Sequence, residues 1–230
     1  MTDRVDVVVV SGEPLWPPHH GGRIRGARIV EELGRRFRVL TVAPVQGAVP
    51  AGVRVEPLPD ELRTSRVFAV ASPQPRLGRA LLGPRRLAVL REVLVRERPA
   101  VLLFASGYLA ARVPDAWLPV AVDFVDVDVR RMASLAGSRG ATLRSRGSAA
   151  VERVKARRWE PEVARRAVLA ASPSNDDVEL LRSWGAAAVH VPHGADRHDV
   201  TPSPVTGPVT FVASFTYAPN VHAARFVLQE

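Results

Sequence analysis

The chain has 230 residues, of which 47% are hydrophobic and 24% charged, so it has the composition of a globular protein and not of a chain disordered from end to end. Cysteine is absent, which excludes disulfides, thiolate metal sites and cysteine nucleophiles. The net charge is +9 at pH 7, and the early apolar run over 5–11 has neither the length nor the flanks of a signal peptide or a membrane span. We therefore expect a cytoplasmic protein. Because of its positive charge, we also expect peripheral contact with the inner face of the membrane.

Short β-branched runs alternate with longer amphipathic stretches along the first 195 residues, the pattern of a parallel sheet with crossover helices. The predicted strands are 5–11, 38–43, 53–56, 100–105, 119–124, 168–171 and 187–191. The predicted helices are 24–36, 78–98, 143–166 and 175–184. Most of the strands are apolar throughout, as in a sheet covered on both faces. The sequence thus predicts an α/β fold, a Rossmann-like doubly wound parallel sheet with helices on both faces.

The last of these helices has a clear start signal. Ser174 is placed to cap it, and Asp177 stands three residues later to complete a capping box. Two stretches rich in proline, glycine, serine or arginine, 43–66 and 133–148, are typical of mobile loops.

The composition changes again near residue 200. The predicted organisation is a Rossmann-like domain over 1–200, a linker over 201–208, and a last segment over 209–230, in which a strand (209–214) and a helix (220–230) open an incomplete second domain. So short a tail cannot build its own core. Its apolar side chains are therefore expected to form an exposed patch, namely Phe211, Tyr217, Phe226 and Leu228.

A glycine-containing loop, SGEPLWPPHHGGRIRG, follows the first strand. Ligands in open α/β sheets bind at the carboxyl ends of strands, and paired glycines before a helix let backbone amides approach a phosphate. Gly21 and Gly22 suit that role, while Arg23 and Arg25 add positive charge and His20 adjoins them. The alternative is that the two glycines only permit a tight turn.

Three carboxylates, Asp123, Asp126 and Asp128, follow the fifth strand. If the chain is extended there, Asp126 and Asp128 point the same way, and one of the cluster can serve as a general base or orient a hydroxyl nucleophile. A magnesium site is a competing hypothesis. The structural alternative is that these aspartates cap the next helix and pair with Arg130 or Arg131.

Two histidine pairs, His19 with His20 and His190 with His193, raise the question of zinc. Neither pair has the helical spacing of a metalloprotease and no cysteine supports them, so loop positions near a ligand are the favoured interpretation.

Positive charge is concentrated in residues 130–166, which contain eleven basic and three acidic side chains. A one-sided distribution of this kind favours an anionic partner, such as phosphates or an anionic membrane surface, although a solvated helix face explains many arginines individually. The aromatic content of 6% offers little for base stacking, so nucleic acid is the least expected partner.

Taken in order, these motifs resemble the retaining family 4 glycosyltransferases of GT-B fold, in particular a subgroup of sugar transferases in exopolysaccharide assembly. The segments that carry the resemblance are PPHHGGRIR (17–25), DFVDVD (123–128), Trp159 with Glu160, SPSNDDVELLR (172–182), VPHGAD (191–196) and FVASFTYAPNVHAARF (211–226). His193 and Ala195 stand where that family usually has Asn and Val, and Ala213 replaces a usual glycine.

The resemblance implies two Rossmann-like domains, of which 1–200 is the acceptor-side domain and 209–230 opens an incomplete donor-binding domain. It also implies transfer of a sugar, with retention, from a nucleotide-sugar to the hydroxyl of a glycan or lipid-linked acceptor. It implies no metal and no other cofactor. The loop against the donor phosphates or acceptor would contain Gly21, Gly22, Arg23, Arg25 and His20. Asp126, and after it Asp123, would lie near the reacting sugar, and the cleft would also contain Asp128, Glu160, His193, Gly194 and Asp196.

The family's donor-binding basic residues and its paired glutamates would lie beyond Glu230, so we expect negligible transfer by this chain alone. The alternative functions are a non-catalytic α/β module that binds an anionic partner through 130–166, or a silent regulator that pairs with a full-length transferase.

Overall fold

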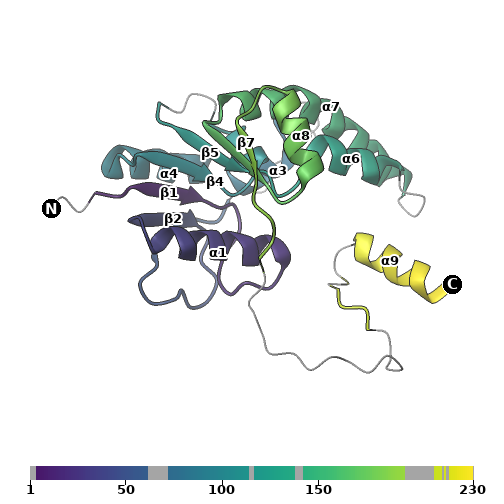
Figure 1. Cartoon of the computed structure of the whole chain (residues 1–230), viewed down its shortest axis with the longest axis horizontal. Helices are drawn as coiled ribbons and strands as arrows, with labels where there is room; N and C mark the ends of the chain where they lie inside the picture. The colour runs from purple at the N-terminus through teal and green to yellow at the C-terminus, as the bar shows by residue number, and fades with distance from the viewer. Residues whose placement is uncertain are drawn as a thin grey trace. The chain divides into compact units, whose positions relative to one another are not determined.

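The computed structural model describes residues 4–61, 72–113, 117–137, 142–194, 210–213, 215 and 218–229 (Figure 1). The chain divides into two units, Met1–His193 and Gly194–Glu230. Among the described residues, no helix is both long and apolar enough to cross a membrane.

The first unit is built on a seven-stranded sheet in the order β3-β2-β1-β4-β5-β6-β7, in which every pairing is parallel. The strands are β1 (Val7–Val10), β2 (Val39–Ala43), β3 (Arg54–Pro57), β4 (Val101–Phe104), β5 (Val120–Asp123), β6 (Leu169–Ser172) and β7 (Ala188–His190). All seven correspond to predicted strands, and the predicted Rossmann-like α/β fold is confirmed.

The strand order reverses between β1 and β4, and this reversal places helices on opposite faces. Right-handed crossovers put α1 (Gly21–Gly34), between β1 and β2, on one face. The later crossovers place α4 (Pro84–Glu97), α5 (Gly107–Ala110), α7 (Leu143–Arg166) and α8 (Asn175–Ser183) on the other, as Figure 1 shows for α1 against α7 and α8. The carboxyl ends of β1 and β4 flank such a switch point, where ligands of doubly wound sheets bind.

The core follows the alternation of side chains along the strands. Val8 and Val10 of β1 belong to a large apolar cluster with α4, α5, α7 and α8. Val7 and Val9 belong to a smaller cluster with Ala27 and Val30 of α1 and with the β1–α1 loop. Strands buried on both faces explain the apolar runs in the sequence.

The helix predicted over 78–98 is in fact two helices, α3 (Arg76–Leu81) and α4. Pro84 has no N–H and fits the first position of a helix, so the chain breaks at Gly83 and starts again. Two helices were not predicted, the short α5 and α6 (Asp128–Gly137).

The mobile loop predicted over 133–148 is wrong for residues 133–137 and 143–148, which are helical. Residues 143–148 also belonged to the helix predicted over 143–166, which is confirmed as α7. Helix α6 continues to Gly137, and α7 begins at Leu143 with the Thr142 hydroxyl accepting the Ser145 N–H. Serine and glycine suggested a loop, but α6 packs along α7, and this packing outweighs their weak helix propensity.

Helix α8 begins as predicted, with the Ser174 hydroxyl accepting the Asp177 N–H at 3.3 Å. The capping box is only half formed. The Ser174 N–H donates to the Ser172 hydroxyl, and the Asp177 carboxylate accepts from Arg130 on α6 at 2.9 Å. The second half of the predicted box is therefore replaced by a contact between two helices.

In the second unit, α9 (Ala218–Gln229) confirms the predicted tail helix. The strand predicted over 209–214 is absent from its described part, 210–213. A strand needs a partner for its backbone groups, and the described residues of this unit contain none. Phe211, Phe226 and Leu228 are exposed as expected. The predicted linker and Tyr217 lie outside the described residues.

Candidate functional site at the carboxyl edge of the sheet

Three chain segments meet at one buried ion pair. Arg25 on α1 donates from Nε and Nη2 to the two carboxylate oxygens of Asp123, each at 2.8 Å. Its Nη1 donates to the carbonyls of Val191, at 2.8 Å, and Pro192, at 3.4 Å. Since Asp123 ends β5 and Val191 follows β7, this side chain joins α1 to two strand ends.

Both side chains of the pair are almost completely buried, and each satisfies the other in bidentate geometry. A buried ion pair is tolerated in the interior only when the two side chains satisfy each other's charge and hydrogen-bonding groups. The geometry therefore gives no support to Arg25 as a phosphate ligand or to Asp123 as the second choice for the residue at the reacting sugar. The sequence predicted both residues at this edge of the sheet but did not predict that they pair with each other.

The first turn of α1 is open. Gly21 and Gly22 are exposed, a Cβ on Gly21 would meet nothing within 4 Å, and one on Gly22 would meet only the His20 ring at 3.6 Å. Neither glycine has a positive φ, so a tight turn does not explain them. His20 makes no side-chain cap bond, which leaves the N–H groups of this turn available.

Arg23 follows the two glycines in the same turn. Its Nε is buried and has no hydrogen-bond partner among the described residues. An unpaired buried donor is costly, and an anionic oxygen would satisfy it. On the other side of the turn, His20 Nε2 lies 3.4 Å from Glu13 Oε2, with both side chains about half exposed.

After β5 the chain does not stay extended, so the prediction that Asp126 and Asp128 point the same way is wrong. Asp126 lies in an exposed bend and makes no hydrogen bond or ion pair with the described residues. Asp128 is buried as the first residue of α6 and pairs with Arg131, as the structural alternative proposed. Burial raises the pKa of Asp128, against the opposing effect of Arg131.

Glu160 is fully buried under the start of α6. Its carboxylate accepts the backbone N–H groups of Asp128 and Val129, the latter at 2.8 Å. Burial, together with the charge of Asp128, raises the pKa of Glu160 to about 8 although the two N–H groups lower it. Trp159 packs in the core. Its neighbour Glu160, through the two hydrogen bonds, fixes the residue at which α6 begins.

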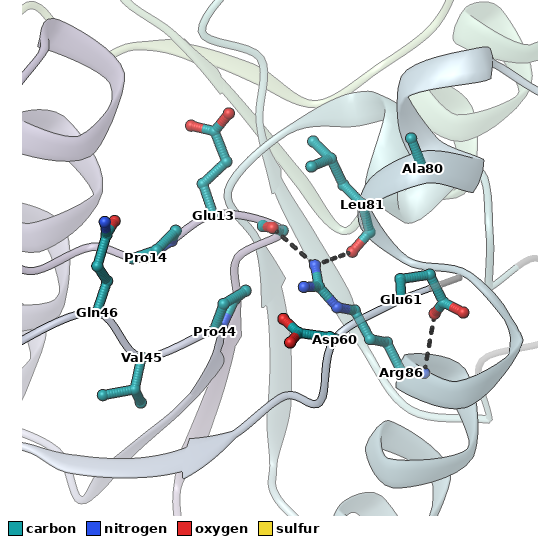
Figure 2. Close-up of a pocket in the computed structure, with 11 residues that line it drawn as sticks. Glu13, Pro14, Pro44, Val45, Gln46, Asp60, Glu61, Ala80, Leu81 and Arg86 are labelled. Atoms are coloured by element: carbon teal, nitrogen blue, oxygen red, sulfur yellow. Dashed lines mark hydrogen bonds between the residues drawn. The ribbon is translucent and has the colours of Figure 1, made fainter. Parts of the chain in front are cut away.

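A cleft of about 470 Å³ opens beside this edge and was not predicted from the sequence (Figure 2). It lies over the loops that follow β1, β2 and β3 and over α3, and is lined by Gly12, Glu13, Pro14, Pro44, Val45, Gln46, Asp60, Glu61, Ala80, Leu81 and Arg86. The volume is that of a small-ligand site. Glu13 belongs both to the cleft and to the contact with His20, so the cleft adjoins the α1 turn.

Arg86 lies in the lining, with Asp60 and Glu61 on either side of its side chain in Figure 2. The guanidinium donates to the carbonyls of Pro59, Gly12 and Leu81, and its backbone N–H donates to Glu61. Burial lowers the pKa of Arg86. Because these carbonyls occupy the guanidinium, the cleft offers a ligand mainly carboxylate oxygens. No short sequence motif signals this arrangement, since Gly12 and Arg86 are 74 residues apart.

The remaining predicted residues lie at the end of β7. His193 and Gly194 are exposed, whereas Asp196 lies outside the described residues. His190 Nε2 lies 3.0 Å from the Pro173 carbonyl. Within the described ranges, no three His, Asp or Glu side chains are grouped so that they could hold a metal ion.

No family model matches the chain, and no curated protein matches it. Among solved structures, sucrose-phosphate synthase from Thermosynechococcus elongatus is similar with a TM-score of 0.54 and 12% identity, over 84% of this chain and 49% of that one. UGT2 from Phytolacca americana, complexed with UDP-2fluoro-glucose and pterostilbene, is similar with a TM-score of 0.51 and 11% identity, over 86% and 56%. The chain has the α/β fold of these GT-B glycosyltransferases.

The chain spans about half the length of each of these two structures. At this level of identity the similarity concerns the fold, so membership of family 4 and of its exopolysaccharide subgroup stays a prediction.

Proposed function

We propose that this chain is the acceptor-side domain of a retaining, nucleotide-sugar-dependent glycosyltransferase of family 4 type. The observation that carries the proposal is the open first turn of α1, with exposed Gly21 and Gly22 and the unpaired Arg23 Nε, at the carboxyl edge of a sheet with the glycosyltransferase fold. In this proposal, residues 1–200 form the acceptor-side domain, 201–208 are a linker, and 209–230 are the start of the donor-binding domain.

The donor phosphates lie against the first turn of α1 in this proposal. Free N–H groups and the positive end of the helix favour an anion there, and a glycine at position 21 lets the phosphate approach the backbone. Arg23 supplies a donor that the described residues leave unsatisfied. These groups offset the diphosphate charge without a metal or other cofactor.

In the reaction, the bond between the sugar's anomeric carbon and the donor phosphate breaks, and the nucleoside diphosphate leaves with the electron pair. The acceptor hydroxyl oxygen forms the new bond to that carbon. In this proposal Asp126, which is exposed and makes no hydrogen bond or ion pair with the described residues, orients the hydroxyl and receives its proton. Asp123 is buried against Arg25 and takes no part.

The acceptor site in this proposal is the cleft beside α1. Carboxylate oxygens of Glu13, Asp60 and Glu61 accept hydrogen bonds from hydroxyl groups, which suits a glycan. The same carboxylates repel a phosphate, so a lipid-linked acceptor would place its sugar in the cleft and its phosphate outside.

Titration of the purified chain with UDP and UDP-glucose, followed by backbone amide NMR, tests the donor site. We expect the largest shifts at residues 20–24, and Arg23→Ala is expected to weaken binding about tenfold because it removes a charge-assisted hydrogen bond. Arg28→Ala is the matched control, since Arg28 lies on the same helix but pairs with Glu31. Equal binding by Arg23→Ala and wild type would contradict the proposed donor site.

A further inference from the structure

The outer face of α7 exposes apolar side chains to solvent. Leu143 is 84% exposed, Val151 39% and Val154 56%. Gly147 and Ala150 are exposed between them. With a helical period of 3.6 residues these five positions fall on one side of the helix.

The opposite side of α7 faces the protein. Ala149, Ala156, Trp159 and Val163 are buried, and the last three belong to the main core. The core therefore leaves the outer stripe uncovered, although exposed apolar surface on a helix is unfavourable in water.

Several arginines beside this stripe pair with no carboxylate of the described residues. Arg144, Arg157, Arg158 and Arg165 are exposed and form no ion pair with the described residues, and the Arg146 Nε donates only to the Ala136 carbonyl. Charge that is unpaired in the fold is available to an external anion.

Four other cations of the basic region are already paired. Arg130 contacts Asp177, Arg131 contacts Asp128, Lys155 contacts Glu152 and Arg166 contacts Glu162. The basic region 130–166 identified in the sequence thus reduces to a narrower surface on α7, centred on residues 143–158.

We propose that this surface docks on an anionic lipid bilayer. Leu143, Val151 and Val154 enter the boundary between headgroups and acyl chains, and Arg144, Arg157 and Arg158 contact lipid phosphates. An apolar stripe bordered by arginines is the arrangement of helices that lie in a membrane interface. Nucleic acid fits less well, because the exposed face of α7 carries no aromatic side chain for base stacking. The proposal does not depend on the proposed glycosyl transfer.

Vesicle co-sedimentation without any nucleotide-sugar tests this surface. The vesicles are phosphatidylcholine alone or phosphatidylcholine with about 30% phosphatidylglycerol, in about 50 or 300 mM NaCl, conditions that change screening strongly. We expect binding to the anionic vesicles only, weakened at least about fivefold by the higher salt.

Two pairs of substitutions separate the two contributions. Leu143→Ser with Val154→Ser removes the apolar stripe, and Arg157→Gln with Arg158→Gln removes two charges; each pair is expected to weaken binding at least about fivefold. The matched control, Arg36→Gln with Arg91→Gln, removes the same charge from exposed positions outside α7 and should change binding less than about twofold. Arg23→Ala should leave vesicle binding intact, which distinguishes this surface from the proposed donor site.

Several results would overturn the proposal. Equal binding to neutral and anionic vesicles would remove the electrostatic contribution, and full binding by Leu143→Ser with Val154→Ser would remove the apolar one. Tighter binding to a DNA duplex or to single-stranded RNA would assign the surface to nucleic acid. A dimer in size-exclusion chromatography that the two serines dissociate would assign it to a second copy of the chain.

Discussion

Glu160 is the residue on which the start of α6 depends. Its carboxylate occupies two N–H groups of the first turn of α6, so a buried side chain on α7 sets the point at which the Asp126 bend ends. Asp126 itself is exposed, whereas Glu160 is fully buried, so the two acidic residues contribute to the edge in different ways. Glu160 positions the loop, and Asp126 is the carboxylate that a ligand can reach.

Glu160→Gln is expected to remove a pH dependence from stability. The pKa of Glu160 is about 8 in the folded chain against 4.5 ordinarily, so the folded state holds this proton more tightly than the unfolded state. The resulting stability is fully present below pH 4.5 and is lost as pH rises through 8, with a slope of at most about 1.4 kcal/mol per pH unit. The unfolding free energy of the wild type should therefore fall, relative to that of Glu160→Gln, as pH rises from 4.5 through 8.

Urea unfolding at a series of pH values measures this difference. Glu162→Gln is the control, because Glu162 lies on the same helix but is mostly exposed and pairs with Arg166. Parallel curves for wild type and Glu160→Gln would show that Glu160 does not bind the proton more tightly in the folded state.

Helix α1 combines a structural and a proposed binding role in different parts of its length. Ala27 and Val30 pack on the sheet, and Arg25 joins the helix to β5 and to the end of β7. Gly21 and Gly22 have no internal packing that requires glycine. The cost of glycine in a helix is therefore unexplained by the fold and is consistent with close approach of a ligand.

Gly21→Ala is expected to move stability and ligand binding in opposite directions. Alanine reduces the freedom of the unfolded chain and should raise the free energy of unfolding by about 0.5 kcal/mol. Its methyl group should weaken UDP-glucose binding at least about fivefold, because it occupies the space that the proposed phosphate needs. Chemical unfolding and calorimetric titration measure the two effects.

Gly34→Ala is the matched control at the other end of α1, where a Cβ also meets nothing within 4 Å. It should stabilise by a similar amount and leave binding unchanged. Unaltered binding by Gly21→Ala would place the phosphates away from this turn.

Across the whole first unit, the edge of the sheet is held together by contacts between residues far apart in the chain. Arg25 and Asp123 are 98 residues apart, and Arg25 and Val191 are 166 apart. The ion pair therefore joins segments that are far apart in the chain, in addition to balancing two buried charges.

Arg25→Met is expected to destabilise the chain by about 3–5 kcal/mol, because it leaves the Asp123 carboxylate buried without a partner. Adding Asp123→Leu should recover at least half of that loss, since a buried pair replaced by apolar side chains is far less costly than a broken one. Urea unfolding of both single variants and the double variant measures the coupling. If Asp123→Leu brings no recovery in the Arg25→Met background, the isolated carboxylate is not the source of the loss.

Local pattern was enough to place the seven strands, the start of α8 at Ser174 and the full extent of α7. These features depend on apolar periodicity and on capping residues within a few positions of each other, which the sequence displays directly. The helix break at Pro84 could also have been predicted from the sequence. The amphipathic pattern continues across it, however, and favoured a single helix over 78–98.

The organisation of the candidate site depended on contacts that no local pattern encodes. The pairing of Arg25 with Asp123, the seating of Glu160 under α6 and the cleft around Arg86 all join residues from separate elements. Sequence placed several charged groups at the carboxyl edge of the sheet, but burial and geometry determined which of them pair with each other and which stay open to a ligand. A charged side chain in the interior must find its partner wherever the fold brings one, and that partner is specified by the packing of the sheet and helices.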